Sequence, residues 1–318
     1  MLTLNQIKEA RERISPYIVE TPLVRLPGLD SKLGCIVYAK AECLQITGAF
    51  KLRGAANRVL QMTESQRQYG LVAASSGNHG KGLSYMAKKL GIKATIVIPD
   101  TAPDIKVNTI KGLGAEVVRC KTVERFDVAD RIRAETGASM IPPFNDIDVM
   151  AGQGTIGLEI AEQMPSLDMV VVPVSGGGLI GGVSTALKNL IPGMKIYGAE
   201  PAALPRYTAS LAAGRPVTVE QKPTLADALV SNRPGDVCFP QVARYVDGFA
   251  DVSDEDMLRA AKLLLTEGHL LAEFSSAIGI AAVLSGQIKV QPTDKVCFVI
   301  SGGSVELSQL DVLREINV

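Results

Sequence analysis

Unbroken apolar runs that pass through a glycine-rich loop into a helical stretch constrain the fold of this chain more than any other feature. Residues 170–174 form one such run, which continues into the glycine-rich residues 175–182, and residues 71–74 continue into residues 75–80 in the same way. Strands without an alternation of polar and apolar residues are buried on both faces, as in parallel sheets covered by helices. The pattern therefore predicts an α/β fold with a ligand site at the carboxyl ends of the strands.

Short β-branched runs alternate with longer helical stretches along the chain, without a repeat or a low-complexity linker. We expect strands at residues 35–39, 70–74, 94–98, 115–118, 169–172, 195–198 and 296–300. Helical stretches separate these runs, which is the order of elements that parallel sheets require.

Composition limits the classes of partner. The 318 residues are 47% hydrophobic and only 21% charged, which is enough for a sizeable core in one large or two medium domains. Because 33 basic and 33 acidic residues balance, no net charge favours nucleic acid or an anionic membrane as the partner. No apolar stretch approaches the roughly 20 residues that cross a bilayer, and the polar residues 1–9 lack a signal-peptide pattern. We therefore expect a cytoplasmic protein with a small-molecule ligand.

Cysteine and histidine offer little chemistry to this chain. The five cysteines are widely scattered and show no C-x-x-C spacing, so neither a disulfide framework nor a zinc site is expected. The two histidines, His79 and His269, leave few ways to build a Ser-His-Asp triad or a histidine-rich metal centre. A borrowed cofactor tethered to a lysine is one of the few remaining options for an enzyme of this composition.

Lys51 is the candidate for that tether, because it lies between small and aromatic residues just ahead of an apolar helical pattern. Apolar surroundings disfavour the ammonium form, so such a lysine loses its proton more easily and becomes a nucleophile for a Schiff base. An isolated lysine of this kind is more often a surface residue whose stem covers an apolar patch. The glycine loop at residues 176–182 changes that balance, since its backbone N–H groups and the helix N-terminus that follows suit a phosphate. A tight turn without a ligand is the simpler alternative for this loop.

Together these segments resemble the fold-type II pyridoxal-phosphate enzymes, and within them the threonine dehydratase and serine racemase branch. The matching motifs lie at residues 21–23, 40–42, 48–54, 75–80, 142–144, 151–155, 175–179 and 301–303. The resemblance thus spans nearly the whole chain. It implies a two-domain α/β fold like that of the tryptophan synthase β subunit, with residues 1–69 and 147–318 in a large cofactor-binding domain and residues 70–146 in a small mobile domain. It also implies a homodimer or homotetramer.

The resemblance implies pyridoxal 5'-phosphate as the cofactor and assigns a set of positions to it. These positions are Phe50, Lys51, Asn78, Ser175, Gly176, Gly177, Gly178, Leu179, Glu273 and Ser301. Lys51 would form the Schiff base and then act as the base at the substrate Cα, while Asn78 would donate its amide to the ring hydroxyl. Ser301 would lie opposite the pyridine nitrogen, where a neutral hydroxyl leaves the ring unprotonated and favours expulsion of a β-hydroxyl. Glu273 would contact the ring or cap a helix.

The expected reaction is α,β-elimination from a β-hydroxy amino acid such as L-serine or L-threonine, which yields a 2-oxo acid and ammonia. In relatives, the substrate carboxylate binds to the loop that corresponds to Ser75, Ser76, Gly77, Asn78 and His79. Ser76 is the ambiguous residue, because serine racemases carry a serine here as a second acid/base on the face opposite the lysine. The catalytic candidates are therefore Lys51 and Ser76. A carboxylate-binding hydroxyl or a turn residue is an equally good interpretation of Ser76.

Three alternative functions stay open. The first is a serine or aspartate racemase with elimination as a side activity. The second is a hydroxyaspartate dehydratase, in which Arg206 would bind the second carboxylate at the substrate end of the cleft. The third and more remote is a nucleotide-binding oxidoreductase or module, because Glu200 follows the glycine loop at roughly the distance of a dinucleotide fingerprint. The resemblance also covers a divalent-metal loop, but Arg206 stands where that loop has an aspartate, so we predict no metal site.

Overall fold

The computed structural model describes residues 1–75, 77–102 and 104–317, in which strands and helices alternate. The strands are β1 (Leu23–Arg25), β2 (Ile36–Lys40), β3 (Leu71–Ala74), β4 (Ala94–Pro99), β5 (Glu116–Cys120), β6 (Ser139–Met140), β7 (Met169–Pro173), β8 (Lys195–Pro201), β9 (Gly248–Val252) and β10 (Lys295–Val299). The α-helices are α1 (Leu4–Ile14), α2 (Asp30–Leu33), α3 (Lys51–Leu60), α4 (Glu64–Tyr69), α5 (Asn78–Leu90), α6 (Asp104–Gly112), α7 (Arg125–Thr136), α8 (Ile147–Gln163), α9 (Gly178–Leu190), α10 (Arg206–Ala212), α11 (Phe239–Tyr245), α12 (Asp254–Thr266), α13 (Ile278–Leu284) and α14 (Leu307–Leu310). Short 3-10 helices are η1 (Ser15–Tyr17), η2 (Pro27–Leu29), η3 (Glu42–Leu44), η4 (Thr122–Glu124), η5 (Phe274–Ala277) and η6 (Asp311–Arg314).

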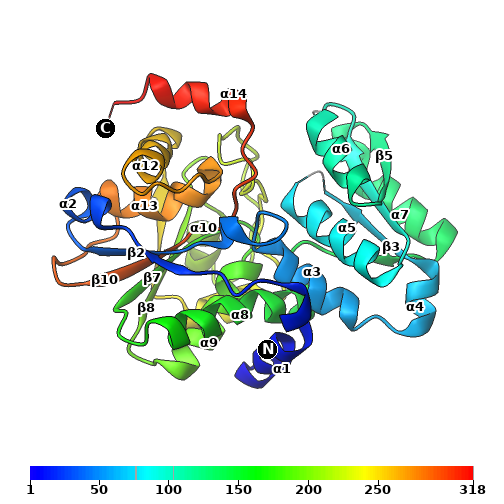
Figure 1. The fold of residues 1–318 in the computed structure, drawn as a ribbon, viewed down its shortest axis with the longest axis horizontal. Coiled ribbons are helices and arrows are strands. Elements are labelled where there is room, and N and C mark those ends of the chain that lie inside the picture. Colours follow the sequence, from blue (N-terminus) through cyan, green and yellow to red (C-terminus); the bar gives the residue numbers. More distant parts are fainter. Residues whose placement is uncertain (76, 103, 318) are drawn as a thin grey trace.

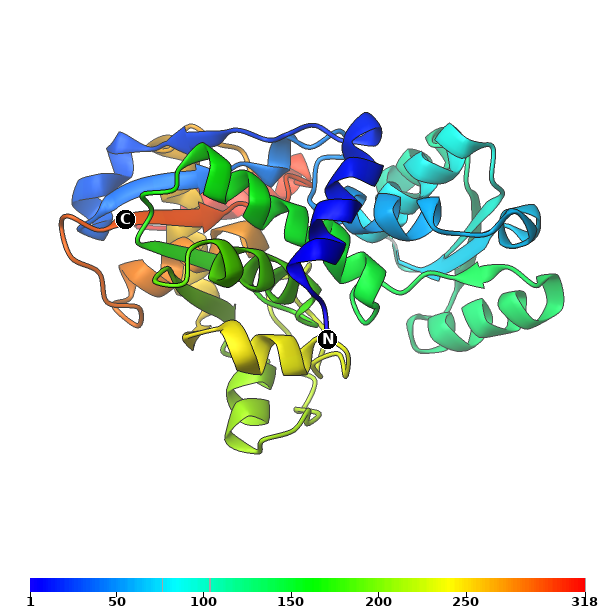
Figure 2. The same cartoon turned by 90° about the horizontal axis from the view of Figure 1, so that it is seen from below.

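The strands form two sheets covered by helices. The larger sheet has six strands in the order β1-β2-β10-β7-β8-β9, and the smaller has four in the order β5-β4-β3-β6. Figures 1 and 2 show the two sheets in separate lobes that lie side by side. Within the described residues the strand pairs are parallel, apart from the antiparallel pair of β1 and β2 at one edge of the larger sheet. This arrangement confirms the predicted α/β fold with parallel sheets.

Every strand that the sequence predicts is present, with bounds that shift by one to three residues. Strands β1, β6 and β9 are not among the predicted strands. The first two contain three and two residues, too few to show a periodic pattern. Strand β9 includes Gly248 and Asp251, which are residue types that strands disfavour. The mobility of residues 70–146 and the homodimer or homotetramer stay predictions. None of the described helices is long and apolar enough to cross a membrane.

Helix α3 contacts both lobes and so determines where its first residue lies. Leu52, Ala55 and Val59 belong to the hydrophobic core that packs against the smaller sheet. On another face, α3 lies so close to α8 that a Cβ atom at Gly54 would collide with the side chain of Gln153. Only a glycine permits this approach. The start of α3 is therefore fixed between the two lobes.

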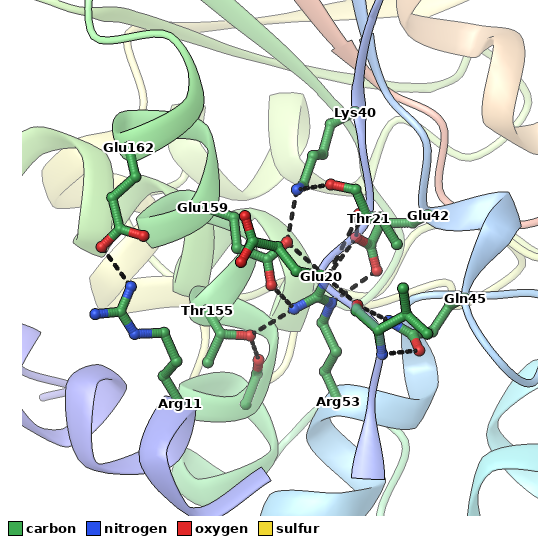
Figure 3. A network of polar contacts seen from close by, with 12 residues as sticks. Arg11, Glu20, Thr21, Lys40, Glu42, Gln45, Arg53, Thr155, Glu159 and Glu162 are labelled. Carbon is green, nitrogen blue, oxygen red and sulfur yellow. Dashed lines mark hydrogen bonds and ion pairs between the residues drawn. The ribbon is translucent and has the colours of Figure 1, made fainter. Parts of the chain in front are cut away.

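A buried network of four charged side chains ties α3 to the larger lobe (Figure 3). Arg53 of α3 donates from Nε to Glu42 Oε2 at 2.8 Å and from Nη2 to Glu159 Oε2 at 2.8 Å. Lys40 of β2 donates from Nζ to the same Glu159 oxygen at 2.6 Å. All four residues are buried, and their two positive and two negative charges balance. Buried charges are tolerated only when each is paired and hydrogen-bonded. The network therefore fixes the positions of β2, η3, α3 and α8 relative to one another.

We expect Arg53→Met to lower the free energy of unfolding by about 3–5 kcal/mol, because it leaves the Glu42 and Glu159 carboxylates buried without their shared partner. Urea denaturation followed by circular dichroism measures the loss. The matched control is Arg11→Met, which removes an exposed ion pair with Glu162 on the same helix α8 and should cost less than about 1 kcal/mol. Similar losses in the two variants would contradict the prediction.

Candidate active site

A cavity of about 940 Å³ lies between the two lobes. Its wall includes the start of α3 and the residues that follow β3, β7 and β10. The carboxyl ends of strands in both sheets thus face one space, which is where open α/β sheets bind their ligands. The volume is in the range of small-molecule sites.

The loop that leads into α3 is hydrogen-bonded to the chain that follows β10. Phe50 N donates to Ser301 O at 3.0 Å, and Gly303 N donates to Gly48 O at 2.8 Å. Gly48 has a φ of 76°, which favours glycine at this turn. These backbone bonds fix Lys51, the residue after Phe50, relative to Ser301. Phe50, Lys51 and Ser301 all line the cavity.

Lys51 is partly exposed to the cavity, but protein atoms surround its ammonium group. Nζ donates to Pro143 O at 2.7 Å and lies 5.2 Å from the centre of the Phe50 ring. Burial lowers the pKa of Lys51 to about 8, and the negative charge of Glu273 opposes this effect only in part. Across the described part of the chain, no carboxylate forms an ion pair with Lys51. A substantial fraction of neutral amine is therefore present near physiological pH, as a Schiff-base nucleophile requires.

The glycine loop between β7 and α9 forms a second wall of the cavity. The predicted cofactor residues Ser175, Gly176, Gly177, Gly178 and Leu179 all line it. Gly177 has a φ of 98°, and a Cβ atom at Gly176 would collide with the Phe144 ring, so both positions require glycine. Ser231 N donates to Ser175 Oγ at 3.2 Å, which orders the start of the loop. The positive potential at the N-terminus of the 13-residue helix α9 favours an anion beside this loop.

Ser301 brings a neutral hydroxyl to the cavity just beyond the end of β10. The residue is buried, and its Oγ lies 3.0 Å from the Ser276 hydroxyl. Gly302 N donates to that same Ser276 hydroxyl at 2.9 Å. The partners of Ser301 here are therefore hydroxyl and backbone groups rather than a carboxylate.

Asn78 and Glu273 form a pair that the sequence does not reveal. The Asn78 amide nitrogen donates to both Glu273 carboxylate oxygens, at 3.1 and 3.0 Å. Burial raises the pKa of Glu273 to about 7, although the bond from Asn78 lowers it. The Glu273 side chain makes no capping hydrogen bond to η5, so the helix-capping alternative is wrong. Both residues line the cavity.

The predicted substrate loop also lines the cavity, through Ser75, Gly77, Asn78 and His79. Ser76 lies outside the described residues, so its role stays a prediction. His79 Nε2 lies 2.9 Å from Ile141 O and must carry the ring proton to bond that carbonyl. Burial lowers the pKa of His79 to about 3, which keeps the ring neutral at ordinary pH. The loop leads into the N-terminus of α5, where free N–H groups suit a carboxylate.

Arg206 is not at the substrate end of the cavity. It is fully buried and lies 3.6 Å from the Glu200 carboxylate in a buried ion pair. The hypothesis that Arg206 binds a second substrate carboxylate is therefore wrong, because the fold pairs this residue with Glu200 instead. Among the described residues, no group of three or more His, Cys, Asp or Glu side chains is arranged to hold a metal ion.

Two polar residues that line the cavity, Gln153 and Ser304, are not among the predicted site residues. Gln153 lies on α8 with 1% of its surface exposed, and its Oε1 has no hydrogen-bond partner among the described residues. A glutamine inside the apolar stretch of α8 is a signal that could have identified it. Ser304 accepts from Lys81 Nζ at 2.6 Å and donates to Asn78 Oδ1 at 2.5 Å. No local pattern predicts Ser304, because its partners come from a distant part of the chain.

The residues of the cavity fit a phosphorylated pyridine aldehyde. Lys51 offers an amine for the aldehyde carbon, and the glycine loop offers amide donors to a phosphate. Ser301 offers a hydroxyl to a ring nitrogen. The buried Gln153 Oε1 and His79 Nδ1 have no partner among the described residues, which is typical of polar groups that meet a ligand or an ordered water.

We expect the apo-protein to form a Schiff base with pyridoxal phosphate at a rate that rises with pH through a midpoint near 8. Only the neutral amine attacks the aldehyde, and the lowered pKa of Lys51 sets how much of it is present. Stopped-flow absorbance over a series of pH values measures this rate. Lys51→Ala is the control and should show no such phase. A midpoint near the value of a free lysine, about 10.4, would contradict the prediction.

Comparisons with known proteins agree with this chemistry. A sequence model of the family described as "Pyridoxal-phosphate dependent enzyme" matches residues 14–302. The chain is 44% identical over 313 residues to L-threonine ammonia-lyase of Thermotoga maritima, which covers 98% of this chain and 78% of that one. It is 40% identical to serine racemase of Arabidopsis thaliana, over 96% of this chain and 93% of that one.

The fold agrees as well. The structure of maize serine racemase superimposes with a TM-score of 0.93 at 38% identity, and the match covers 98% of this chain and 96% of that one. The shared motifs thus lie on a shared fold. Because the family model matches most of the chain and relatives of 40% and 44% identity cover nearly all of it, this chain belongs to the pyridoxal-phosphate dependent enzymes.

Proposed function

We propose that this protein is a lyase that converts a β-hydroxy amino acid such as L-serine or L-threonine into a 2-oxo acid and ammonia. One observation carries the proposal, namely that a single cavity joins the Lys51 amine, the glycine loop of residues 175–178 and the Ser301 hydroxyl. The relatives named for L-threonine ammonia-lyase support the same reaction class. Enzymes of this family are built for chemistry at the Cα atom of an amino acid.

In this proposal the walls of the cavity divide the binding of the cofactor between them. Lys51 binds the aldehyde carbon, the amide groups of residues 175–179 bind the phosphate, and Ser301 contacts the ring nitrogen. When bound, pyridoxal phosphate supplies an electron sink for negative charge that develops at Cα. Glu273 holds the Asn78 amide in place through both of its carboxylate oxygens.

The substrate carboxylate binds to the loop of residues 75–79 in this proposal. Gly77 is the N-cap residue of α5 and makes no side-chain cap, so the first N–H groups of the helix are available to an anion. The neutral His79 ring keeps its bond to Ile141 O and adds no charge of its own. The carboxylate is thus held by backbone donors and a helix dipole.

Lys51 carries the proton. Once the substrate amine has displaced it, Nζ takes the proton from Cα as a general base, and Pro143 O holds this amine in place at 2.7 Å. The proton and the departing β-hydroxyl together amount to the loss of one water. After release, the unsaturated amine takes up one water and yields one 2-oxo acid and one ammonia.

We expect the purified protein to show a visible absorbance band that borohydride removes and that Lys51→Ala lacks, because Lys51 forms no ion pair with a described residue. The other two lysines of the cavity have polar partners, since Lys81 donates to Ser304 and Lys106 pairs with Asp227 and Glu306. Lys51→Ala should also lose nearly all formation of 2-oxo acid from L-serine and L-threonine. The matched control is Lys89→Ala, an exposed lysine on α5, which should keep both the band and the activity. A visible absorbance band of unchanged intensity in Lys51→Ala would contradict the proposal.

Racemisation of serine is a second candidate, favoured by relatives named serine racemase and by the serine at position 76. Inversion at Cα needs one acid/base on each face, whereas elimination needs only Lys51. If racemisation occurs, Ser76→Ala should reduce the yield of D-serine from L-serine at least tenfold, ~1.4 kcal/mol of barrier, and spare the 2-oxo acid. Chiral chromatography with a 2-oxo acid assay measures the ratio. A parallel loss of both products would instead assign Ser76 to substrate binding.

A further inference from the structure

The glycine loop before α9 is held from beneath by the first turn of α10. Tyr207 donates from its hydroxyl to Gly176 O at 3.1 Å, and Arg206 donates from Nη1 to Val174 O at 3.2 Å. Arg206 and Tyr207 are fully buried, and neither lines the cavity. They therefore contact the loop from the side that faces away from the ligand.

Glu200 at the end of β8 holds this turn in place. Its carboxylate accepts from Tyr207 N at 2.9 Å and from Thr208 N at 2.9 Å, so it satisfies N–H groups that a helix start leaves free. The same carboxylate lies 3.6 Å from the Arg206 guanidinium. The Tyr207 ring is stacked on Phe249, with centres 5.1 Å apart and planes 2° apart. The Tyr207 hydroxyl thus has little freedom to leave Gly176.

The hydrogen bonds from Tyr207 to Gly176 O and from Arg206 to Val174 O determine which way the N–H groups of the loop point. In a trans peptide the C=O of one residue and the N–H of the next point to opposite sides of the chain. When Tyr207 binds the carbonyl of Gly176, the N–H of Gly177 faces away from α10. The bond from Arg206 to Val174 O turns the N–H of Ser175 in the same way. Gly235 N adds a further bond to Gly176 O at 2.9 Å.

We propose that Tyr207 and Arg206 are positioning residues for the phosphate. By binding the loop carbonyls on the side away from the cavity, they make the amides of Gly177 and Ser175 face the cavity. This inference rests on the proposed binding of pyridoxal phosphate at Lys51. It gives a role to the buried Glu200–Arg206 pair, which the elimination reaction does not use. A cluster of amides oriented in advance binds an anion without a further ordering cost.

The test compares two aldehydes that differ only in the phosphate. We expect Tyr207→Phe to weaken the affinity of the apo-protein for pyridoxal phosphate about three- to tenfold, the value of one hydrogen bond. Its affinity for pyridoxal, which lacks the phosphate, should not change. Spectral titration of the full-length apo-protein measures both dissociation constants. The control is Tyr197→Phe on β8, whose hydroxyl makes no hydrogen bond among the described residues and which should change neither constant.

A second variant removes the cation without leaving a buried charge. In Glu200→Gln combined with Arg206→Met, the glutamine can still accept from the Tyr207 and Thr208 N–H groups while the bond to Val174 O is lost. We expect this variant to lose affinity for pyridoxal phosphate by at least as much as Tyr207→Phe, again without a change for pyridoxal. The melting temperature of each apo-protein, measured alongside, reports any general loss of structure.

The outcomes separate this inference from the proposed function. Equal losses for pyridoxal phosphate and pyridoxal would assign Tyr207 a general structural role and overturn the inference. An unchanged affinity for pyridoxal phosphate in both variants would overturn it as well, while the proposed function would stand. A wild-type protein that takes up no pyridoxal phosphate at Lys51 would overturn both.

Discussion

The burial of Arg53 between Glu42 and Glu159 is the constraint on which the position of Lys51 depends. Arg53 follows Lys51 by two residues on α3, so the side chain that fixes the helix in the core also fixes the start of that helix. A buried guanidinium tolerates little displacement, because each lost hydrogen bond leaves a buried charge that neither a partner nor water stabilises. The chain thus uses a buried ion network in the larger lobe to place the Lys51 amine at the wall of the cavity.

The segment around the start of α3 is attached to two different parts of the molecule. Through Leu52 and its neighbours, α3 packs against the smaller lobe, and through Phe50 it is bonded to the end of β10. The cavity exists because both attachments start from the same short segment. Two glycines permit this arrangement. At Gly54 the close approach of α8 leaves no room for a side chain, and at Gly48 the left-handed backbone would strain any other residue.

The sequence predicts the parallel sheets, the lysine and the glycine loop because each depends on a local pattern: an apolar run, a residue in apolar company, or a cluster of glycines before a helix. It does not predict the pair of Asn78 and Glu273, because the two are joined only when the lobes come together. Arg206 shows the same limit. A charged residue near a cleft motif suggested a ligand, whereas the fold buries it against Glu200.

The pairing of Gly48 and Phe50 with the chain after β10 joins an early segment to a late one. During synthesis, the lysine is made long before the strand that holds it in place, and domains fold as units once their chain is available. A nascent chain that still lacks β10 therefore has the amine but no finished pocket around it. A pocket that depends on both segments can consequently form only after the chain has been made through the residues that follow β10.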